Sequence, residues 1–236
     1  GSSGVLIFND KLYLNKTPDH PGGGTVDWTN PWGEYKYVDN IEAREDGGTP
    51  GFLQAIRVAL SIKLKEQIGV KNIEAREKEL VAKAFELMDP IEKLHILSGD
   101  LKDRLGVISF YMEDIHYNLA VKILNDRFGI QLRGGCACAG TYGHFLMGIT
   151  SCESKKITEK INTGDLSSKP GWVRLSLHPT MTIQELEFVA QAFKELIENI
   201  SEWEKDYRYN PKNNEFIHLS ETIDKVELVK EWFEFE

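Results

Sequence analysis

Apolar residues recur every three or four positions in two long stretches of the chain, which is the spacing of one face of an α-helix. The first stretch lies between Gly48-Thr49-Pro50 and Gly69 and carries Leu53, Ile56, Leu60, Leu64 and Ile68. Thr49 is predicted to be its N-cap and Pro50 its first helical residue, with Gly69 at its end.

The second stretch follows Thr182-Ile183-Gln184-Glu185, which has the form of a capping box. Its apolar face consists of Leu186, Val189, Ala190, Phe193, Leu196 and Ile200. Two further helices are predicted over 72–88, stopped by Pro90, and over 117–128, ended by Gly129.

Short β-prone runs separate these helices. Residues 5–8 and 11–15 flank Asn9-Asp10, a dipeptide that suits a tight turn, so they predict a β-hairpin. Four more strands are predicted over 94–97, 107–111, 130–133 and 172–177. Helices that alternate with strands indicate an α/β or α+β architecture.

The pattern also predicts a division near residue 65. Residues 1–65 are glycine-rich loop and hairpin up to the long helix, whereas residues 66–236 form a compact mixed pattern. The chain begins abruptly with a β-prone run after Gly1-Ser2-Ser3-Gly4, so we expect sequence to be missing upstream.

Composition narrows the class of protein. Hydrophobic residues make up 41% and charged residues 28% of the 236, as in ordinary globular proteins. The net charge of −9 argues against a nucleic-acid partner, and the apolar stretches are far shorter than a membrane span. Three cysteines and the absence of a signal-peptide pattern predict a cytoplasmic protein.

Two glycine-rich motifs could carry chemistry. Pro21-Gly22-Gly23-Gly24-Thr25 lets the backbone turn sharply and approach another group closely, or is simply a flexible loop. Gly48-Thr49-Pro50 stands at a predicted helix start, where free N–H groups and the Thr49 hydroxyl suit a phosphate. The alternative for Thr49 is an ordinary helix cap.

A cysteine-containing loop follows the predicted strand over 130–133. It reads Arg133-Gly134-Gly135-Cys136-Ala137-Cys138-Ala139-Gly140, and an arginine nearby favours the reactive thiolate. Two alternatives stay open, which are a pair of small buried cysteines and a metal site that adds His144 and Cys152. The cysteine spacing is unusual for zinc, so no metal is predicted.

Arg174 is the fourth candidate. In an alternating strand it shares a face with Trp172 and Ser176, opposite Val173, Leu175 and Leu177. Its guanidinium could hold a substrate carboxylate through two hydrogen bonds, or its stem could merely pack on Trp172 at the surface.

Taken in order, these motifs resemble the second half of a class V aminotransferase-fold enzyme, and most of all the cysteine desulfurase and selenocysteine lyase branch. The similar segments are residues 4–7, 21–26, 44–50, 128–139, 173–177 and the helix behind them. The resemblance implies a C-terminal portion of a fold-type I pyridoxal-phosphate enzyme, with residues 1–65 as the end of the large domain and 66–236 as the small α+β domain.

The resemblance also implies roles for single residues. Gly48 and Thr49 would reach the phosphate of a cofactor held by the neighbouring subunit of a homodimer. Arg174 would bind the α-carboxylate of an amino-acid substrate. Cys138 would attack the substrate sulfur and become a persulfide, and it matches that position better than Cys136.

The departures from the family pattern limit this reading. The Schiff-base lysine belongs upstream of residue 4, and neither Lys11 nor Lys16 occupies its place, so the chain alone is expected to be inactive. Histidine commonly adjoins the loop cysteine, where Ala137 stands here, which leaves transaminase, lyase and epimerase reactions open. A second hypothesis is a non-catalytic sulfur-carrying or protein-interaction module that uses Cys138.

Overall fold

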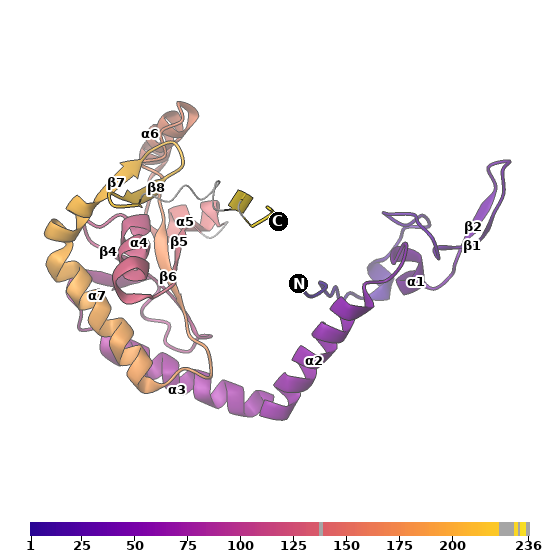
Figure 1. Cartoon of the computed structure of the whole chain (residues 1–236), viewed down its shortest axis with the longest axis horizontal. Helices are drawn as coiled ribbons and strands as arrows, with labels where there is room; N and C mark the ends of the chain where they lie inside the picture. Colours follow the sequence, from indigo (N-terminus) through magenta and orange to yellow (C-terminus); the bar gives the residue numbers. More distant parts are fainter. Residues whose placement is uncertain (137–138, 222–228, 231, 235–236) are drawn as a thin grey trace. The chain divides into compact units, whose positions relative to one another are not determined.

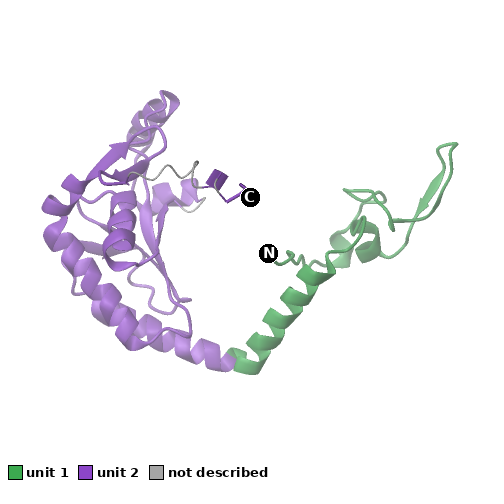
Figure 2. Cartoon of the chain, viewed as in Figure 1, with its two compact units in different colours: residues 1–70 green, residues 71–236 purple. Residues whose placement is uncertain are grey.

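The computed structural model describes residues 1–236 except 137–138, 222–228, 231 and 235–236. The chain forms two compact units, Gly1–Val70 and Lys71–Glu236 (Figure 2). The predicted assignment of residues 1–65 to a large cofactor-binding domain stays a prediction. Among the described residues, no helix is long and apolar enough to cross a membrane.

Unit 2 is built on a four-stranded antiparallel sheet. The strands are β3 (Leu94–Ile96), β4 (Val107–Met112), β5 (Arg133–Gly135) and β6 (Trp172–Ser176), and their spatial order is β3-β4-β6-β5 (Figure 1). Its long helices are α3 (Val70–Met88), α4 (Tyr117–Phe128) and α7 (Ile183–Trp203). The shorter elements are α5 (Gly140–Leu146), α6 (Ser151–Asn162), η2 (Glu204–Asp206), β7 (Tyr207–Asn210) and β8 (Glu215–His218).

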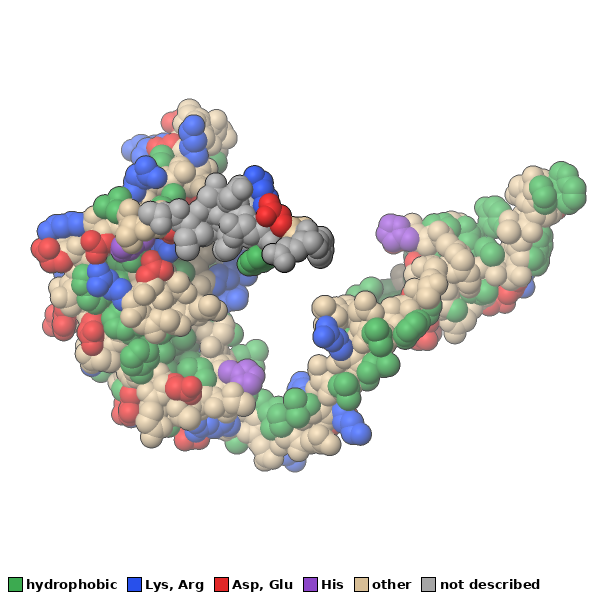
Figure 3. Space-filling model, viewed as in Figure 1, with side chains coloured by type: hydrophobic (Ala, Val, Ile, Leu, Met, Phe, Trp, Pro, Cys, Tyr) green, Lys and Arg blue, Asp and Glu red, His purple; other side chains and the backbone are tan. Residues whose placement is uncertain are grey.

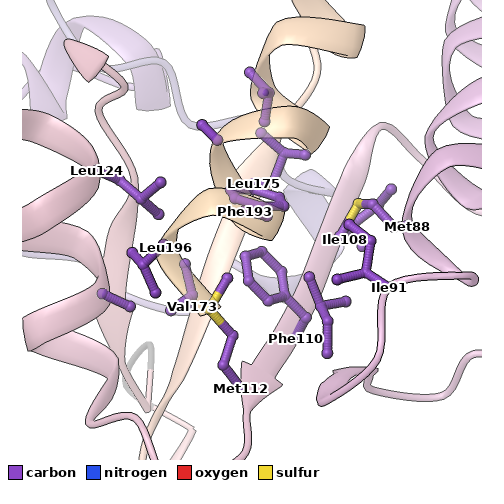
Figure 4. Packing of buried hydrophobic residues seen from close by; sticks show 14 of the residues in the cluster. Met88, Ile91, Ile108, Phe110, Met112, Leu124, Val173, Leu175, Phe193 and Leu196 are labelled. Carbon is purple, nitrogen blue, oxygen red and sulfur yellow. The ribbon is translucent and has the colours of Figure 1, made fainter. Parts of the chain in front are cut away.

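One face of this sheet is the core. Strand β4 alternates, so Ile108, Phe110 and Met112 are buried together with Val173 and Leu175 of β6. Figure 4 shows these side chains meeting Phe193 and Leu196 of α7, and the rings of Phe110 and Phe193 lie 4.9 Å apart. Each large side chain buried here contributes about 1.5–3 kcal/mol relative to an exposed one. The other sheet face is therefore left for polar residues.

The helices of unit 2 follow local signals. Thr182 and Glu185 form the expected capping box of α7, and Thr150 and Glu153 form another at α6. Gly129 ends α4 in the left-handed conformation, at φ +69. The helices predicted over 72–88, over 117–128 and after Thr182 are confirmed, as are the strands near 94–97, 107–111 and 172–177.

Unit 1 contains η1 (Asp10–Leu12), β1 (Val26–Thr29), β2 (Tyr35–Tyr37), α1 (Ile41–Glu45) and α2 (Phe52–Ile68). All of its residues are described, and only Pro18 and Thr25 are buried. Apolar side chains lie along its surface, including the α2 residues Leu53, Ile56, Leu60 and Leu64 (Figure 3). The apolar residues of α2 have the helical spacing predicted from the sequence, but unit 1 by itself buries none of them.

Three local predictions are wrong. The hairpin over 5–15 is absent, because the Asn9 side chain accepts from Lys11 N and caps the 3-10 turn η1. The α2 helix begins at Phe52 with Gly51 as N-cap, so Thr49 is not its cap and Pro50 is not helical. The strand predicted over 130–133 begins only at Arg133, because Ile130 N still bonds to Leu124 O in the C-cap of α4.

Candidate functional site

The glycine motifs of unit 1 meet backbone to backbone. Gly48 N donates to Gly23 O at 2.8 Å. A Cβ on Gly47 would lie 2.7 Å from His20 O, and one on Gly22 would lie 3.3 Å from the Gly47 backbone. Glycine is needed at these positions because the two loops approach more closely than a side chain allows. We call residues 20–25 and 47–48 the glycine junction.

Thr25 stabilises the glycine junction through buried hydrogen bonds. Its residue is fully buried, and its Oγ1 donates to Gly22 O at 2.6 Å and accepts from Gly22 N at 3.2 Å. Arg44 supports the same region by donating to Val38 O at 3.0 Å and lying over the Tyr13 ring. The sequence analysis missed this role of Thr25, although a threonine directly after three glycines is a signal for such a turn.

Gly48 and Thr49 lie between the glycine junction and α2. Gly48 has a φ of +92, and Thr49 is exposed. The N-cap of α2, Gly51, makes no side-chain hydrogen bond to the first turn. An exposed hydroxyl beside a helix N-terminus without a side-chain cap is an arrangement that can hold a phosphate.

Arg174 lies on the polar face of the sheet in unit 2. The strand register sets it opposite Arg133 of β5 on one side and Ser109 of β4 on the other. Directly paired residues of antiparallel strands point to the same face, so the two guanidinium groups share it. The Nε of Arg174 is buried and has no hydrogen-bond partner within the described part of the chain.

Two positively charged side chains on one face of a sheet attract an anion. The buried Nε of Arg174, which has no partner in the described part of the chain, carries a free-energy cost. A carboxylate could relieve this cost, because it accepts two parallel hydrogen bonds from a guanidinium. The sequence analysis proposed Arg174, but not Arg133, as a carboxylate-binding residue, since the pairing of β5 with β6 is a tertiary contact.

Aromatic residues continue this face beside Arg174. Trp172 is buried, and a Cβ on Gly143 of α5 would lie 3.0 Å from its ring, so α5 packs directly on it. Two strands away, His95 stacks on Tyr111 with ring centroids 4.9 Å apart and bonds to Glu113. The polar face therefore has an aromatic wall at the end where β5 leads into the cysteine loop.

The cysteine loop begins directly after β5. Cys138, the predicted nucleophile, and Ala137 lie outside the described residues, so Cys138 stays a prediction. Cys136 is a free, half-buried thiol, and Ala139 N donates to its backbone oxygen at 2.9 Å.

The other candidates for metal ligation have different roles. The two ring nitrogens of His144 bond to Gly140 O and to Ser154 Oγ, at 2.8 and 2.9 Å. Cys152 is exposed. No group of three His, Cys, Asp or Glu side chains is placed to hold a metal ion in the part of the chain that the structure describes. Thr49 belongs to unit 1 and Arg174 to unit 2, so a pocket shared by both stays a prediction.

Comparisons of the sequence and of the structure with known proteins point to the same family. The model of the Aminotransferase class-V family matches residues 3–189. A "Probable cysteine desulfurase" of Staphylococcus aureus (strain Mu50) is 32% identical over 137 residues, which are 58% of this chain and 32% of that protein. A protein with the same description from Staphylococcus epidermidis is 34% identical over a match of the same length.

Two solved structures are similar as well. The apo cysteine desulfurase from Thermococcus onnurineus NA1 superposes with a TM-score of 0.59 at 28% identity, over 77% of this chain and 40% of that one. The cysteine desulfurase CsdA from Escherichia coli gives a TM-score of 0.56 over 77% of this chain and 39% of that one, and at 15% identity it shows the fold alone. The chain thus spans less than half the length of the relatives that it matches.

Proposed function

We propose a function for this chain, which belongs to the Aminotransferase class-V family and is cysteine desulfurase-like. The chain would form the C-terminal portion of a pyridoxal-phosphate enzyme that acts on an amino acid, and cysteine would be its preferred substrate. The observation that carries it is the cross-strand pair of Arg133 and Arg174 on the polar face of the sheet.

The arginine pair would bind the α-carboxylate of the substrate. Arg174 is held on both sides in the middle of the sheet, and a buried, unsatisfied Nε leaves it with hydrogen-bonding capacity toward an acceptor. Arg133 stands at the start of β5, so the same strand that faces Arg174 leads into the cysteine loop. A carboxylate held here would lie on the side of the sheet that bears the aromatic wall.

Cys138 would act on the sulfur of that substrate. Its thiolate would form a sulfur–sulfur bond as the carbon–sulfur bond of cysteine breaks. The bonding electron pair would remain with the carbon, which takes up a proton to become the methyl group of alanine. Cys136 is two residues away in the sequence and is a free thiol of the same loop. A transaminase-like, lyase or epimerase reaction would need no such thiol, which gives a direct way to tell the reactions apart.

The residues of unit 1 fit the phosphate of pyridoxal phosphate. Thr49 and the N-terminus of α2, which Gly51 leaves without a side-chain cap, offer a hydroxyl and a positive dipole end. When bound, the cofactor supplies the electron sink that stabilises a carbanion. We propose that the lysine that holds it is not among residues 1–236, since neither Lys11 nor Lys16 matches the family position.

A homodimer is part of the proposal. Unit 1 exposes a row of apolar α2 side chains, and surfaces of this kind commonly mark contacts with other protein. In the family arrangement proposed here, the glycine junction would present Gly48 and Thr49 to the neighbouring subunit. The exposed apolar row supports such a contact.

The first test replaces Arg174 in the protein that carries this chain. Arg174→Lys should lower kcat/KM for L-cysteine, followed as alanine release, by about 10- to 100-fold, because a point charge replaces a planar group that bonds to both carboxylate oxygens. Arg208→Lys is the matched control, since Arg208 is exposed on β7. An unchanged kcat/KM in Arg174→Lys would show that the carboxylate is bound elsewhere.

The second test concerns Cys138. Cys138→Ser should abolish persulfide formation on the protein, whereas Cys152→Ser should leave it intact. Alanine release that is unaffected by Cys138→Ser would exclude the thiol mechanism. A persulfide that Cys138 of the isolated chain receives from a sulfur donor, with no cofactor present, would instead support the sulfur-carrying module.

A further inference from the structure

The hairpin formed by β7 and β8 lies beyond the part of the chain that matches the family model. Its turn carries Asn214, which is 8% exposed and has a φ of +60. A buried asparagine in the left-handed conformation is costly unless its polar atoms are paired. The partners of Asn214 therefore indicate what the hairpin does.

Asn214 is satisfied by three residues. Its Nδ2 donates to the Tyr117 hydroxyl at 2.7 Å, and its Oδ1 accepts from the Tyr209 hydroxyl at 2.8 Å. Its backbone oxygen accepts from Asn118 Nδ2 at 2.6 Å. The hairpin turn is thus bonded to the first turn of α4 by side chain and backbone together.

The Tyr117 ring in turn packs against the backbone of β5 and against the residue that precedes β6. A Cβ on Gly171 would lie 2.6 Å from the Tyr117 ring, and one on Gly134 would lie 3.2 Å from it. Gly171 directly precedes β6, and Gly134 is the middle residue of β5. The ring therefore supports the backbone from which both Arg174 and the cysteine loop extend.

The Cys136 thiol lies within electrostatic reach of this tyrosine. Burial raises the pKa of Tyr117, the bond from Asn214 opposes the rise, and Tyr209 and Cys136 add to it. Aromatic packing adds a second link to the hairpin, because His116 stacks on Tyr117 at 4.4 Å and meets Tyr209 and Phe216 at 5.5 and 5.2 Å. The hairpin therefore contacts Tyr117 directly at its hydroxyl and, through His116, at its ring.

We propose that Asn214 is a positioning residue, which through Tyr117 fixes the backbone of residues 134–136 at the base of the cysteine loop. Loss of the bond between Asn214 and Tyr117 would let this segment open more often while the rest of unit 2 stays folded. The importance of the segment for sulfur chemistry rests on the proposed function, but the positioning itself does not.

Thiol alkylation of the full 236-residue chain tests the proposal. The rates at Cys136 and at Cys152 are measured by mass spectrometry with iodoacetamide, well below the melting temperature. Cys152 is an internal reference, since it is exposed at the start of α6. Asn214→Ala and Tyr117→Phe should each raise the ratio of the Cys136 rate to the Cys152 rate by about fivefold, the effect of losing one buried hydrogen bond that limits a local opening.

The matched control is Asn213→Ala. Asn213 occupies the same turn, but its side chain is exposed, and the bond it makes among the described residues stays within the hairpin, to Glu215. Asn213→Ala should leave the rate ratio unchanged. The double variant Asn214→Ala with Tyr117→Phe should raise the ratio by less than the product of the two single effects, because both single variants remove the bond between Asn214 and Tyr117.

Two outcomes would overturn the proposal. One is an unchanged ratio in Asn214→Ala and Tyr117→Phe with a lowered melting temperature, which would make the pair merely structural. The other is a parallel rise at Cys136 and Cys152, which would indicate general loosening. If Asn214→Ala does not fold, the result for Tyr117→Phe tests the proposal, since this variant keeps the ring against Gly134 and Gly171. No activity is measured, so failure here is distinct from failure of the arginine and Cys138 tests.

Discussion

Close backbone contacts at a few glycines shape both units of this protein. At Gly47 the contact is another loop, and at Gly171 it is the ring of Tyr117. Neither glycine has a positive φ. Both positions require glycine because there is no room for a Cβ atom. These glycines differ from Gly48 and Gly129, where the positive φ is the requirement.

Gly171→Ala should therefore lower the free energy of unfolding by about 1–3 kcal/mol, because the new methyl group would lie against the buried Tyr117 ring. Gly140→Ala is the control, since no atom of the described residues lies within 4 Å of its Cβ position at the start of α5. That variant should be neutral or stabilised by up to about 1 kcal/mol. Urea denaturation measures both, and equal stabilities would contradict the close packing at Gly171.

At the scale of elements, α4 has an unusual beginning. His116 is its N-cap, and Nδ1 of the ring accepts from Asn118 N at 3.1 Å, so the ring proton belongs on Nε2. Nε2 is buried among Tyr117, Tyr209 and Phe216 and has no partner within the described part of the chain. Burial lowers the pKa of His116 from its ordinary value of 6.5, and a weaker contribution from Asn214 opposes the shift.

This arrangement predicts a pH dependence. The unfolded chain binds a proton at His116 near pH 6.5, whereas the folded chain does so only at lower pH, so stability is greatest above pH 7 and falls as the pH drops through 6.5. His116→Asn keeps a capping side chain without the titration and should flatten the change between pH 7 and about 5.5, above the range of ordinary carboxylates. Urea midpoints across that range, with His178→Asn as control, test it, and an unaltered slope in His116→Asn would refute the assignment.

At the scale of the whole molecule, the two units differ in what holds them together. Unit 2 packs one sheet face and three helices around a common core. Unit 1 relies on backbone contacts at the glycine junction, on Thr25 and on the interactions of Arg44, and its long helix α2 has no buried residue. Helices of this length owe most of their stability to packing of an apolar face.

Hydrogen exchange of the chain should reflect this difference. Amides of α2 should exchange at least about tenfold faster than those of α7, because local opening of α2 exposes no additional core. The comparison is internal, since both helices belong to the same molecule and are read in one mass-spectrometric experiment. Equal protection of α2 and α7 in a dilute sample would show that unit 1 is stable without a covering partner.

The sequence by itself determined the elements whose signals are local. Helices with a capping box, a terminal glycine or a stopping proline were predicted near their observed bounds, since these signals act within one turn. The family was also contained in the sequence, because the order and spacing of the motifs from Pro21 to Arg174 are together more specific than any one of them.

The tertiary structure decided which residues meet. The pairing of Arg133 with Arg174, the bond from Gly48 to Gly23 and the bond from Asn214 to Tyr117 join residues that lie up to 97 positions apart. The hairpin of β7 and β8 went unpredicted because each strand has only four residues, and its docking on α4 gives them their partners. Such contacts arise from packing a particular sheet order, which no short stretch of sequence encodes.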